Sequence, residues 1–191
     1  GQHAITMARQ HRDMSVRASQ LEEAVKEKRR ELEESHVRGC VVNRTDANQV
    51  VGGGVANEAN GRLTMRDSSI TECIATHSGS GPATGGGLLN QGVAELCAST
   101  IEENRAIASS GAALGGGVTN DRFSHLSAIS SSISRNLASS GSGQANGGGL
   151  RNNGDVDLVA SRVDDNQAVS STSNALGGGV FNDGAGAFLK T

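Results

Sequence analysis

The sequence predicts an all-β protein, a right-handed single-stranded parallel β-helix of about five coils of ~30 residues, preceded by a long N-terminal α-helix. Three observations support this fold class. A glycine triplet recurs at a nearly constant interval, aliphatic and asparagine positions lie at fixed offsets from each triplet, and apolar and polar residues alternate between triplets. We therefore expect two domains, an amphipathic or coiled-coil helix over 1–38 and a β-helix repeat domain over 39–191.

The N-terminal segment differs from the rest of the chain, because residues 5–34 contain neither glycine nor proline. Apolar residues recur there every seven positions, in one row at 7, 14 and 21 and a second at 18, 25 and 32. So narrow a stripe is typical of an amphipathic helix lying on its own domain or on a partner, or of a coiled coil. His11 and Lys28 fall on the stripe and weaken the coiled-coil alternative. The candidate docking residues on this helix are Met7, Met14, Leu21, Val25 and Leu32.

The repeat begins with glycine triplets at 52–54, 85–87, 115–117, 147–149 and 177–179, at intervals of 33, 30, 32 and 30 residues. An aliphatic residue follows each triplet, and an asparagine comes two residues later. Identical residues at a constant period predict coils that stack on themselves. Stacked amides can then form a hydrogen-bonded ladder. The members of this first ladder are Asn57, Asn90, Asn120, Asn152 and Asn182.

A second column of asparagines follows a Ser-x-aliphatic step. Three residues after the aliphatic residue come Asn104, Asn136 and Asn166, with Cys73 at the same place in the first full unit. Alanine follows two residues later in every unit. Apolar–polar alternation before the step predicts a strand with one buried face, so we expect about three short strands per coil. Residues 41–43 resemble the tail of an earlier, incomplete unit.

Composition excludes several functional classes. The formal net charge is −3, and the only aromatic residues are three phenylalanines, so the chain has neither the basic field nor the stacking surface of a nucleic-acid binder. No apolar run reaches the ~18 residues of a membrane span. Three cysteines, at 40, 73 and 97, are too few and too unevenly spaced for a disulfide framework or a zinc site. We expect no cofactor and no metal ion.

The best candidate for chemistry is a column of carboxylates. Its best member is the pair Asp164-Asp165. The matching pairs are Thr71-Glu72, Glu102-Glu103 and Ser134-Arg135, so carboxylates occupy the column in three of four coils and Arg135 interrupts it. We interpret these residues as solvated turn positions and expect no catalytic residue. The alternative is a carbohydrate-active, pectate-lyase-like β-helix enzyme, in which clustered carboxylates bind Ca²⁺ or protonate a leaving oxygen.

One further column suggests docking. Arg66, Cys97, Ile129 and Val159 lie near the edge of the inward–outward alternation, and three of the four are apolar. Ile129 and Val159 are therefore candidate docking residues on a lateral stripe. The alternative is an irregular strand that turns these side chains inward.

The pattern GGG-[V/L]-x-N followed by S-x-I-x-x-N-x-A resembles the right-handed parallel β-helix repeats of bacterial surface proteins. It is similar in particular to the polymorphic outer-membrane protein repeats, whose marks are GGA-[I/L/V] and F-x-x-N. Here glycine replaces the alanine, and isoleucine or valine replaces the phenylalanine. The resemblance implies a non-enzymatic structural or adhesive module, a rigid scaffold or docking segment of a surface protein or large assembly. It favours an extracellular or cell-surface location.

The C-terminal residues 187–191 align with the interior of a strand in earlier coils, before the Ser-x-aliphatic step. A coil that stops there exposes unpaired backbone groups, so we expect further residues or another subunit to close it. The expected partners are therefore a protein partner or a second copy of the chain, bound through the N-terminal helix and the open C-terminal coil.

Overall fold

The computed structural model describes residues 17, 35–46, 48–183 and 188–190. The chain divides into two units, 1–34 and 35–191. The helix expected over 5–34 lies outside the described residues, apart from Arg17, which is helical and exposed. The docking candidates Met7, Met14, Leu21, Val25 and Leu32 lie outside them as well. The following description concerns the second unit.

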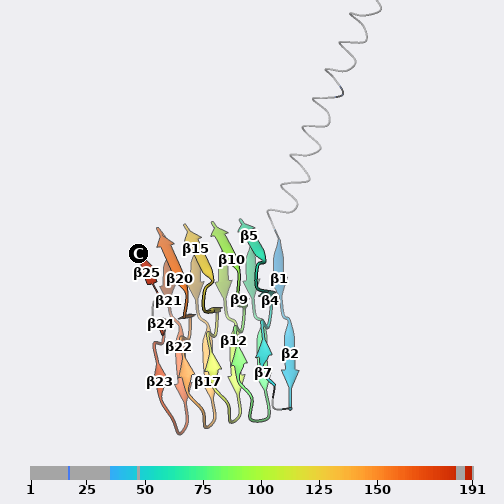
Figure 1. Ribbon diagram of the computed structural model, residues 1–191, viewed down its shortest axis with the longest axis vertical. Coiled ribbons are helices and arrows are strands. Elements are labelled where there is room, and N and C mark those ends of the chain that lie inside the picture. Colours follow the sequence, from blue (N-terminus) through green and yellow to red (C-terminus); the bar gives the residue numbers. More distant parts are fainter. Residues whose placement is uncertain (1–16, 18–34, 47, 184–187, 191) are drawn as a thin grey trace, which may run out of the picture. The chain divides into compact units, whose positions relative to one another are not determined.

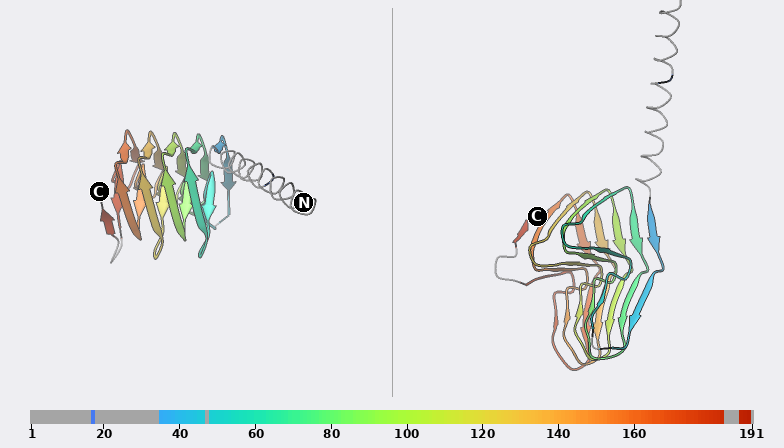
Figure 2. Two further views of the ribbon diagram at one scale, coloured as in Figure 1. Left: turned by 90° about the horizontal axis from the view of Figure 1, so that it is seen from above. Right: turned by 45° about the vertical axis from the view of Figure 1, so that its right-hand side comes forward.

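The second unit is a parallel β-solenoid of five coils, and each coil contributes one strand to each of five sheets (Figure 1). The first coil runs through β1 (His36–Arg38), β2 (Val41–Arg44), β3 (Val50–Val51), β4 (Val55–Asn57) and β5 (Arg62–Arg66). Later strands stack on these in chain order, and the coils lie side by side along the solenoid (Figure 2).

The sheets are named A to E after the order of strands in one coil. Sheet A adds β6 (Ser69–Thr71), β11 (Thr100–Glu102), β16 (Ser132–Ser134) and β21 (Arg162–Asp164) to β1. Sheet B adds β7 (Ile74–His77), β12 (Arg105–Ala108), β17 (Leu137–Ser140) and β22 (Gln167–Ser170) to β2. Sheet C adds β8 (Ala83–Thr84), β13 (Ala113–Leu114), β18 (Ala145–Asn146) and β23 (Ala175–Leu176) to β3.

The two remaining sheets follow the glycine triplets. Sheet D adds β9 (Leu88–Asn90), β14 (Val118–Asn120), β19 (Leu150–Asn152) and β24 (Val180–Asn182) to β4. Sheet E adds β10 (Val93–Cys97), β15 (His125–Ile129), β20 (Asp155–Val159) and β25 (Phe188–Lys190) to β5. Every pairing is parallel and in register, so Ile70 pairs with Ile101 and Ile101 with Ile133.

Each coil has five strands where the sequence predicted about three. Bends with left-handed backbone separate sheet E from sheet A at Asp67, Ala98, Ser130 and Ala160, and sheet A from sheet B at Glu72, Glu103, Arg135 and Asp165. Short polar residues tolerate this conformation, but Glu and Arg do not mark it in a sequence. The glycine triplets divide sheets C and D in the same way, because the first glycine of each triplet has a positive φ.

The solenoid also begins earlier than expected. β1 pairs with β6 through Val37 and Ile70, so Ser35 opens a further coil and the boundary expected at residue 38 falls inside it. Residues 41–43, interpreted as the tail of an incomplete unit, belong to β2 of this coil.

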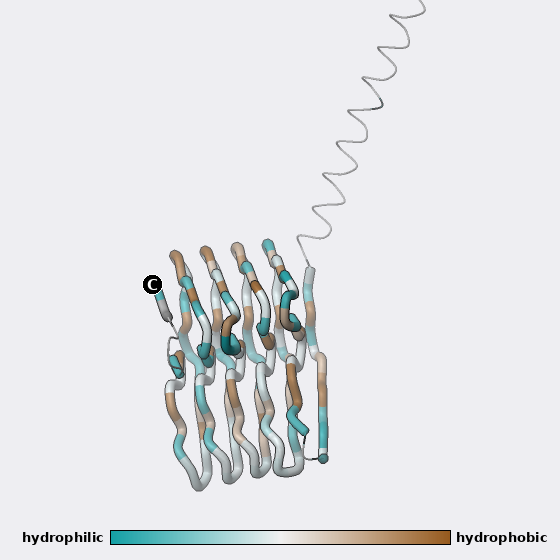
Figure 3. The backbone as a smooth tube through the Cα atoms, viewed as in Figure 1, coloured by the Kyte–Doolittle hydropathy of each residue, from teal (hydrophilic) through white to brown (hydrophobic). Residues whose placement is uncertain are grey.

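The interior contains two columns of apolar side chains of different width. Sheets A, D and E enclose aliphatic residues such as Ile101, Val118 and Leu126, all fully buried. Sheets B and C enclose a cluster of buried alanines, among them Ala106, Ala113 and Ala138, and these small side chains let the two walls approach closely. Apolar segments recur at the same place in successive coils (Figure 3). Among the residues described, no helix is long and apolar enough to cross a bilayer.

Candidate functional site: ladders, a charged corner and an apolar stripe

Asn104, Asn136 and Asn166 form a ladder inside the corner between sheets A and B. Asn136 Nδ2 donates to Asn166 Oδ1 at 3.0 Å and to the Ile101 carbonyl at 3.0 Å. Asn104 repeats this geometry one coil earlier, with Asn136 Oδ1 and the Ile70 carbonyl as acceptors. Asn104 and Asn136 are buried, and Asn166 is half-buried. The side chains of Asn104 and Asn136 thus bond backbone groups of the preceding coil and the asparagine side chain of the next coil.

A second ladder runs along sheet D. Nδ2 of each asparagine donates to Oδ1 of the next, at 2.7 to 2.9 Å. It links Asn57, Asn90, Asn120, Asn152 and Asn182. Nδ2 of Asn90 and of Asn120 also donates to a carbonyl at the start of sheet E, that of His125 and Asp155 respectively. The first four are buried, and Asn182 is exposed in the last coil. Both ladders hold the coils together.

The third glycine of the three middle triplets, at 87, 117 and 149, faces the first-described ladder. A Cβ on Gly117 would lie 2.7 Å from Asn136 Nδ2, and one on Gly87 would lie 2.8 Å from Asn104 Nδ2. The middle glycine, Gly116, packs against the Gly148 carbonyl and the backbone of Leu137. These three triplets therefore allow sheet D to approach the ladder closely.

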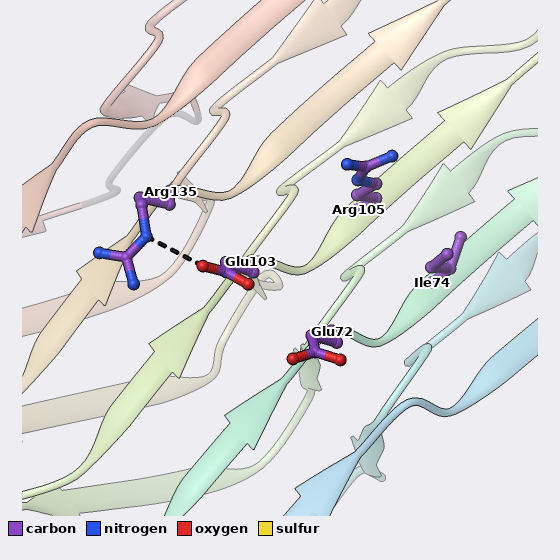
Figure 4. A pocket seen from close by; sticks show the side chains of 5 residues that line it. All are labelled: Glu72, Ile74, Glu103, Arg105 and Arg135. Carbon is purple, nitrogen blue, oxygen red and sulfur yellow. Dashed lines mark hydrogen bonds and ion pairs between the residues drawn. The ribbon is translucent and has the colours of Figure 1, made fainter.

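The charged column lies at the left-handed bends between sheets A and B. It borders a depression of about 230 Å³ lined by Glu72, Ile74, Glu103, Arg105 and Arg135 (Figure 4). Arg135 forms ion pairs with Glu103, at 3.1 Å, and with Glu102. Arg38 pairs with Glu72 at 2.7 Å, and the hydrogen bond to Glu72 together with its charge raises the pKa of the Arg38 guanidinium.

This corner contains the clustered carboxylates that a carbohydrate-active enzyme would use for catalysis or Ca²⁺ binding, but these carboxylates are already paired and exposed. Glu72 and Glu103 each pair with an arginine and are almost half exposed. The depression is smaller than the roughly 300–1,000 Å³ of typical ligand sites. Asp165 is exposed at the equivalent bend of the last coil. Across the described part of the chain, no three His, Cys, Asp or Glu residues lie together as a metal site would require.

The lateral column faces outward on sheet E. Cys97, Ile129 and Val159 are in register on β10, β15 and β20, with Arg66 before them on β5. Ile129 and Val159 are 45% and 51% exposed. The side chains therefore form an apolar stripe at the end of sheet E, and the alternative of an inward-turned strand is wrong for these two residues.

Phe123 is a surface feature that the sequence analysis did not identify. It is 90% exposed, has a φ of 65°, and lies under the Arg122 guanidinium, whose Cζ is 4.7 Å from the ring centroid. The loop around it and the loop at 58–61 flank the shorter turn at Gln91, leaving a depression of about 540 Å³. The longer loop that carries Phe123 could be found in the sequence, because alternate repeat units are two residues longer between sheets D and E.

These features define the class of the molecule as a parallel β-solenoid repeat protein. Comparisons with protein-family models, with curated proteins and with solved structures found no match to this chain. The resemblance to polymorphic outer-membrane repeats therefore has no support from a family match.

Proposed function

We propose that the chain is a non-enzymatic structural or adhesive module, a rigid scaffold or docking segment of a surface protein or large assembly. The observation that carries this proposal is the apolar stripe of Cys97, Ile129 and Val159 on the outer face of sheet E. The coils that present this stripe are joined in the interior by two amide ladders. A surface held by hydrogen bonds in every coil presents its stripe with little loss of conformational entropy on binding. An extracellular or cell-surface location belongs to the same proposal.

We also propose that the coils turn in the right-handed sense, because connections between parallel strands of one sheet are right-handed in almost all proteins. The helix expected over 5–34 and the last coil are further contact regions in this proposal, for a protein partner or a second copy of the chain.

Self-association of the purified chain tests the docking role of the stripe. Sedimentation velocity over a range of concentrations is expected to show association that Ile129→Asp combined with Val159→Asp abolishes. Val169→Asp is the matched control, because Val169 is 47% exposed on sheet B, away from the stripe. Association that is equally weakened by both changes, or that neither weakens, contradicts docking through this stripe.

The carbohydrate-active alternative rests on one observation, the carboxylates and arginines that share the corner depression. Depolymerisation of acidic polysaccharides, followed by the ultraviolet absorbance of unsaturated products or by reducing ends, tests it directly. We expect no turnover above that of a Glu103→Gln variant. Turnover that Glu103→Gln removes would establish the enzyme and refute the scaffold proposal.

A further inference from the structure

Cys40 and Cys73 occupy the ladder column in the first two coils, where later coils have asparagine. The register of β1 with β6 and of β2 with β7 places the two cysteines directly opposite each other. Backbone hydrogen bonds continue on both sides of the pair, from Gly39 N to the Thr71 carbonyl at 3.1 Å and from Ile74 N to the Cys40 carbonyl at 2.7 Å. The two residues are therefore true neighbours in adjacent coils.

The two thiols share one environment. Cys73 is fully buried in the aliphatic core, and the half-buried Cys40 packs against the same core. Cys73 Sγ lies 3.9 Å from the Val37 carbonyl in the coil of Cys40 and 3.3 Å from the Thr71 carbonyl. Cys40 Sγ lies 3.9 Å from the Arg38 carbonyl. These sulfur contacts are weak, so a covalent bond between the two would displace no strong hydrogen bond.

The spacing also suits a bond. Paired strands lie about 4.8 Å apart, and disulfides span Cα–Cα distances of roughly 4.4–6.8 Å. In-register side chains point in parallel, so the two Cβ atoms must approach slightly. β1 is the edge strand of sheet A among the described strands, so only one neighbouring coil resists that movement.

We propose that Cys40 and Cys73 are a covalent modification site, at which a disulfide oxidant such as glutathione disulfide joins the first two coils. Cys40 is the more accessible thiol and reacts first. It loses its proton, and its thiolate attacks one glutathione sulfur, releasing a glutathione thiolate that takes up the proton. Cys73 then loses its proton and attacks the Cys40 sulfur of the mixed disulfide, which releases the second glutathione. Two cysteine thiols are oxidised, and one glutathione disulfide is reduced to two thiols.

The bond closes the chain between residues 40 and 73, at the edge of the solenoid that the described strands form. An edge coil has neighbours on one side only and opens before the central coils. Its covalent attachment to the second coil restricts the unfolded chain and prevents that coil from separating. Cys97 cannot take part in this pairing, because it lies on the outward face of sheet E, where its register neighbours are Arg66 and Ile129.

The test uses the full chain, fully reduced and then equilibrated with glutathione disulfide. Peptide mass spectrometry without reduction is expected to find the peptides of Cys40 and Cys73 linked, with Cys97 outside that pair. The urea midpoint of the oxidised chain should exceed that of the reduced chain by on the order of 1 M. Cys40→Ser and Cys73→Ser should each remove the shift, and Cys97→Ser should retain it.

Three results would overturn the proposal. One is a pair of thiols that both remain open to alkylation in the oxidised native chain. Another is glutathione retained on Cys40 without transfer to Cys73, and the third is a stable bond to Cys97. The comparison of oxidised with reduced wild-type chain needs no variant, so the proposal is testable even where a serine variant fails to fold.

Discussion

Asn166 Oδ1 accepts two hydrogen bonds from the same residue, the backbone N–H of Asn136 at 2.9 Å and its Nδ2 at 3.0 Å. Asn136 Oδ1 receives the same two bonds from Asn104. The left-handed residue before each asparagine turns the chain away from sheet A, so this N–H has no strand to bond. The ladder supplies the missing acceptor in each of these coils.

Asn136→Ala is therefore expected to lower the free energy of unfolding by about 1–3 kcal/mol, because it leaves the buried Asn104 N–H without its acceptor and removes the side-chain bond to the Ile101 carbonyl. Urea unfolding followed by circular dichroism measures the loss. Asn174→Ala serves as the control, since Asn174 is exposed in a turn of the last coil. Equal losses for the two variants would contradict a stabilising ladder.

Glycine packing against the ladder gives a second prediction. Gly117→Ala is expected to cost roughly 2–4 kcal/mol, because its Cβ would lie 2.7 Å from Asn136 Nδ2 in a close-packed interior. Gly179 is the matched position in the last coil, where the nearest atom to an added Cβ is the Val163 carbonyl oxygen at 3.7 Å. Gly179→Ala should change stability by less than about 1 kcal/mol in the same urea titration. A cost as large at Gly179 as at Gly117 would show that backbone freedom, not packing, explains the third glycine.

The repeat made the architecture predictable. Five triplets followed by an aliphatic residue and an asparagine require the same residue of each coil to stack, and Val118, Leu150 and Val180 are in register as that argument demands. The repeat period and the apolar–polar alternation predict the fold because equivalent residues of successive coils stack in a column, and every member of a column has the same surroundings.

Other features were not recognised from the repeat. The bends at Glu103 and Arg135 have left-handed backbone on residues that show no preference for it, so the division of sheet A from sheet B was not visible. Phe123 occurs in one unit only and therefore forms no column. The coil of Cys40 lacks the preceding glycine triplet, so its Ser-x-aliphatic step at Ser35 was not recognised.

The third prediction is that the ion pairs of the charged corner contribute little to the stability of the fold. Arg135 is about half exposed, as is its partner Glu103, and exposed pairs are worth about 0.2–1 kcal/mol. Arg135→Gln should lower the free energy of unfolding by no more than about 1 kcal/mol at low salt, and by less at 1 M salt, where the Debye length is about 3 Å. A loss above about 2 kcal/mol that persists at high salt would indicate a structural role beyond surface pairing.

Alkaline pH provides a fourth prediction, for the reduced chain. Burial raises the pKa of the Cys73 thiol, so the folded state prefers the protonated form more than the unfolded state does. The resulting stability is fully present below the unfolded pKa of about 8.5 and is lost as the pH rises through the folded value. The urea midpoint of the reduced chain should therefore decrease as the pH is raised from neutral to alkaline. The midpoint of the Cys73→Ala variant should decrease less over the same pH range. A parallel decline in both proteins would assign the effect to other groups.

The last prediction concerns Cys73→Asn, which tests whether the ladder of Asn104, Asn136 and Asn166 can be extended by one coil. Asn104 Nδ2 bonds the Ile70 carbonyl at 2.9 Å, and the equivalent acceptor for residue 73 is the Val37 carbonyl, which Cys73 Sγ already faces. An asparagine at 73 would also offer its Oδ1 to the N–H of Cys40, as Asn104 Oδ1 does to Cys73 N at 2.9 Å.

Space for that side chain exists, because Gly54 faces residue 73 as Gly87 faces Asn104. Under reducing conditions the two added hydrogen bonds should raise the free energy of unfolding by roughly 1 kcal/mol. Cys73→Leu is the control of similar shape without polar atoms, and it should lower stability by overpacking the same site. Urea titration of the three proteins separates hydrogen bonding from volume. If the asparagine variant were no more stable than the leucine variant, the ladder would contribute shape alone, and the recurrence of asparagine in this column would need a different cause.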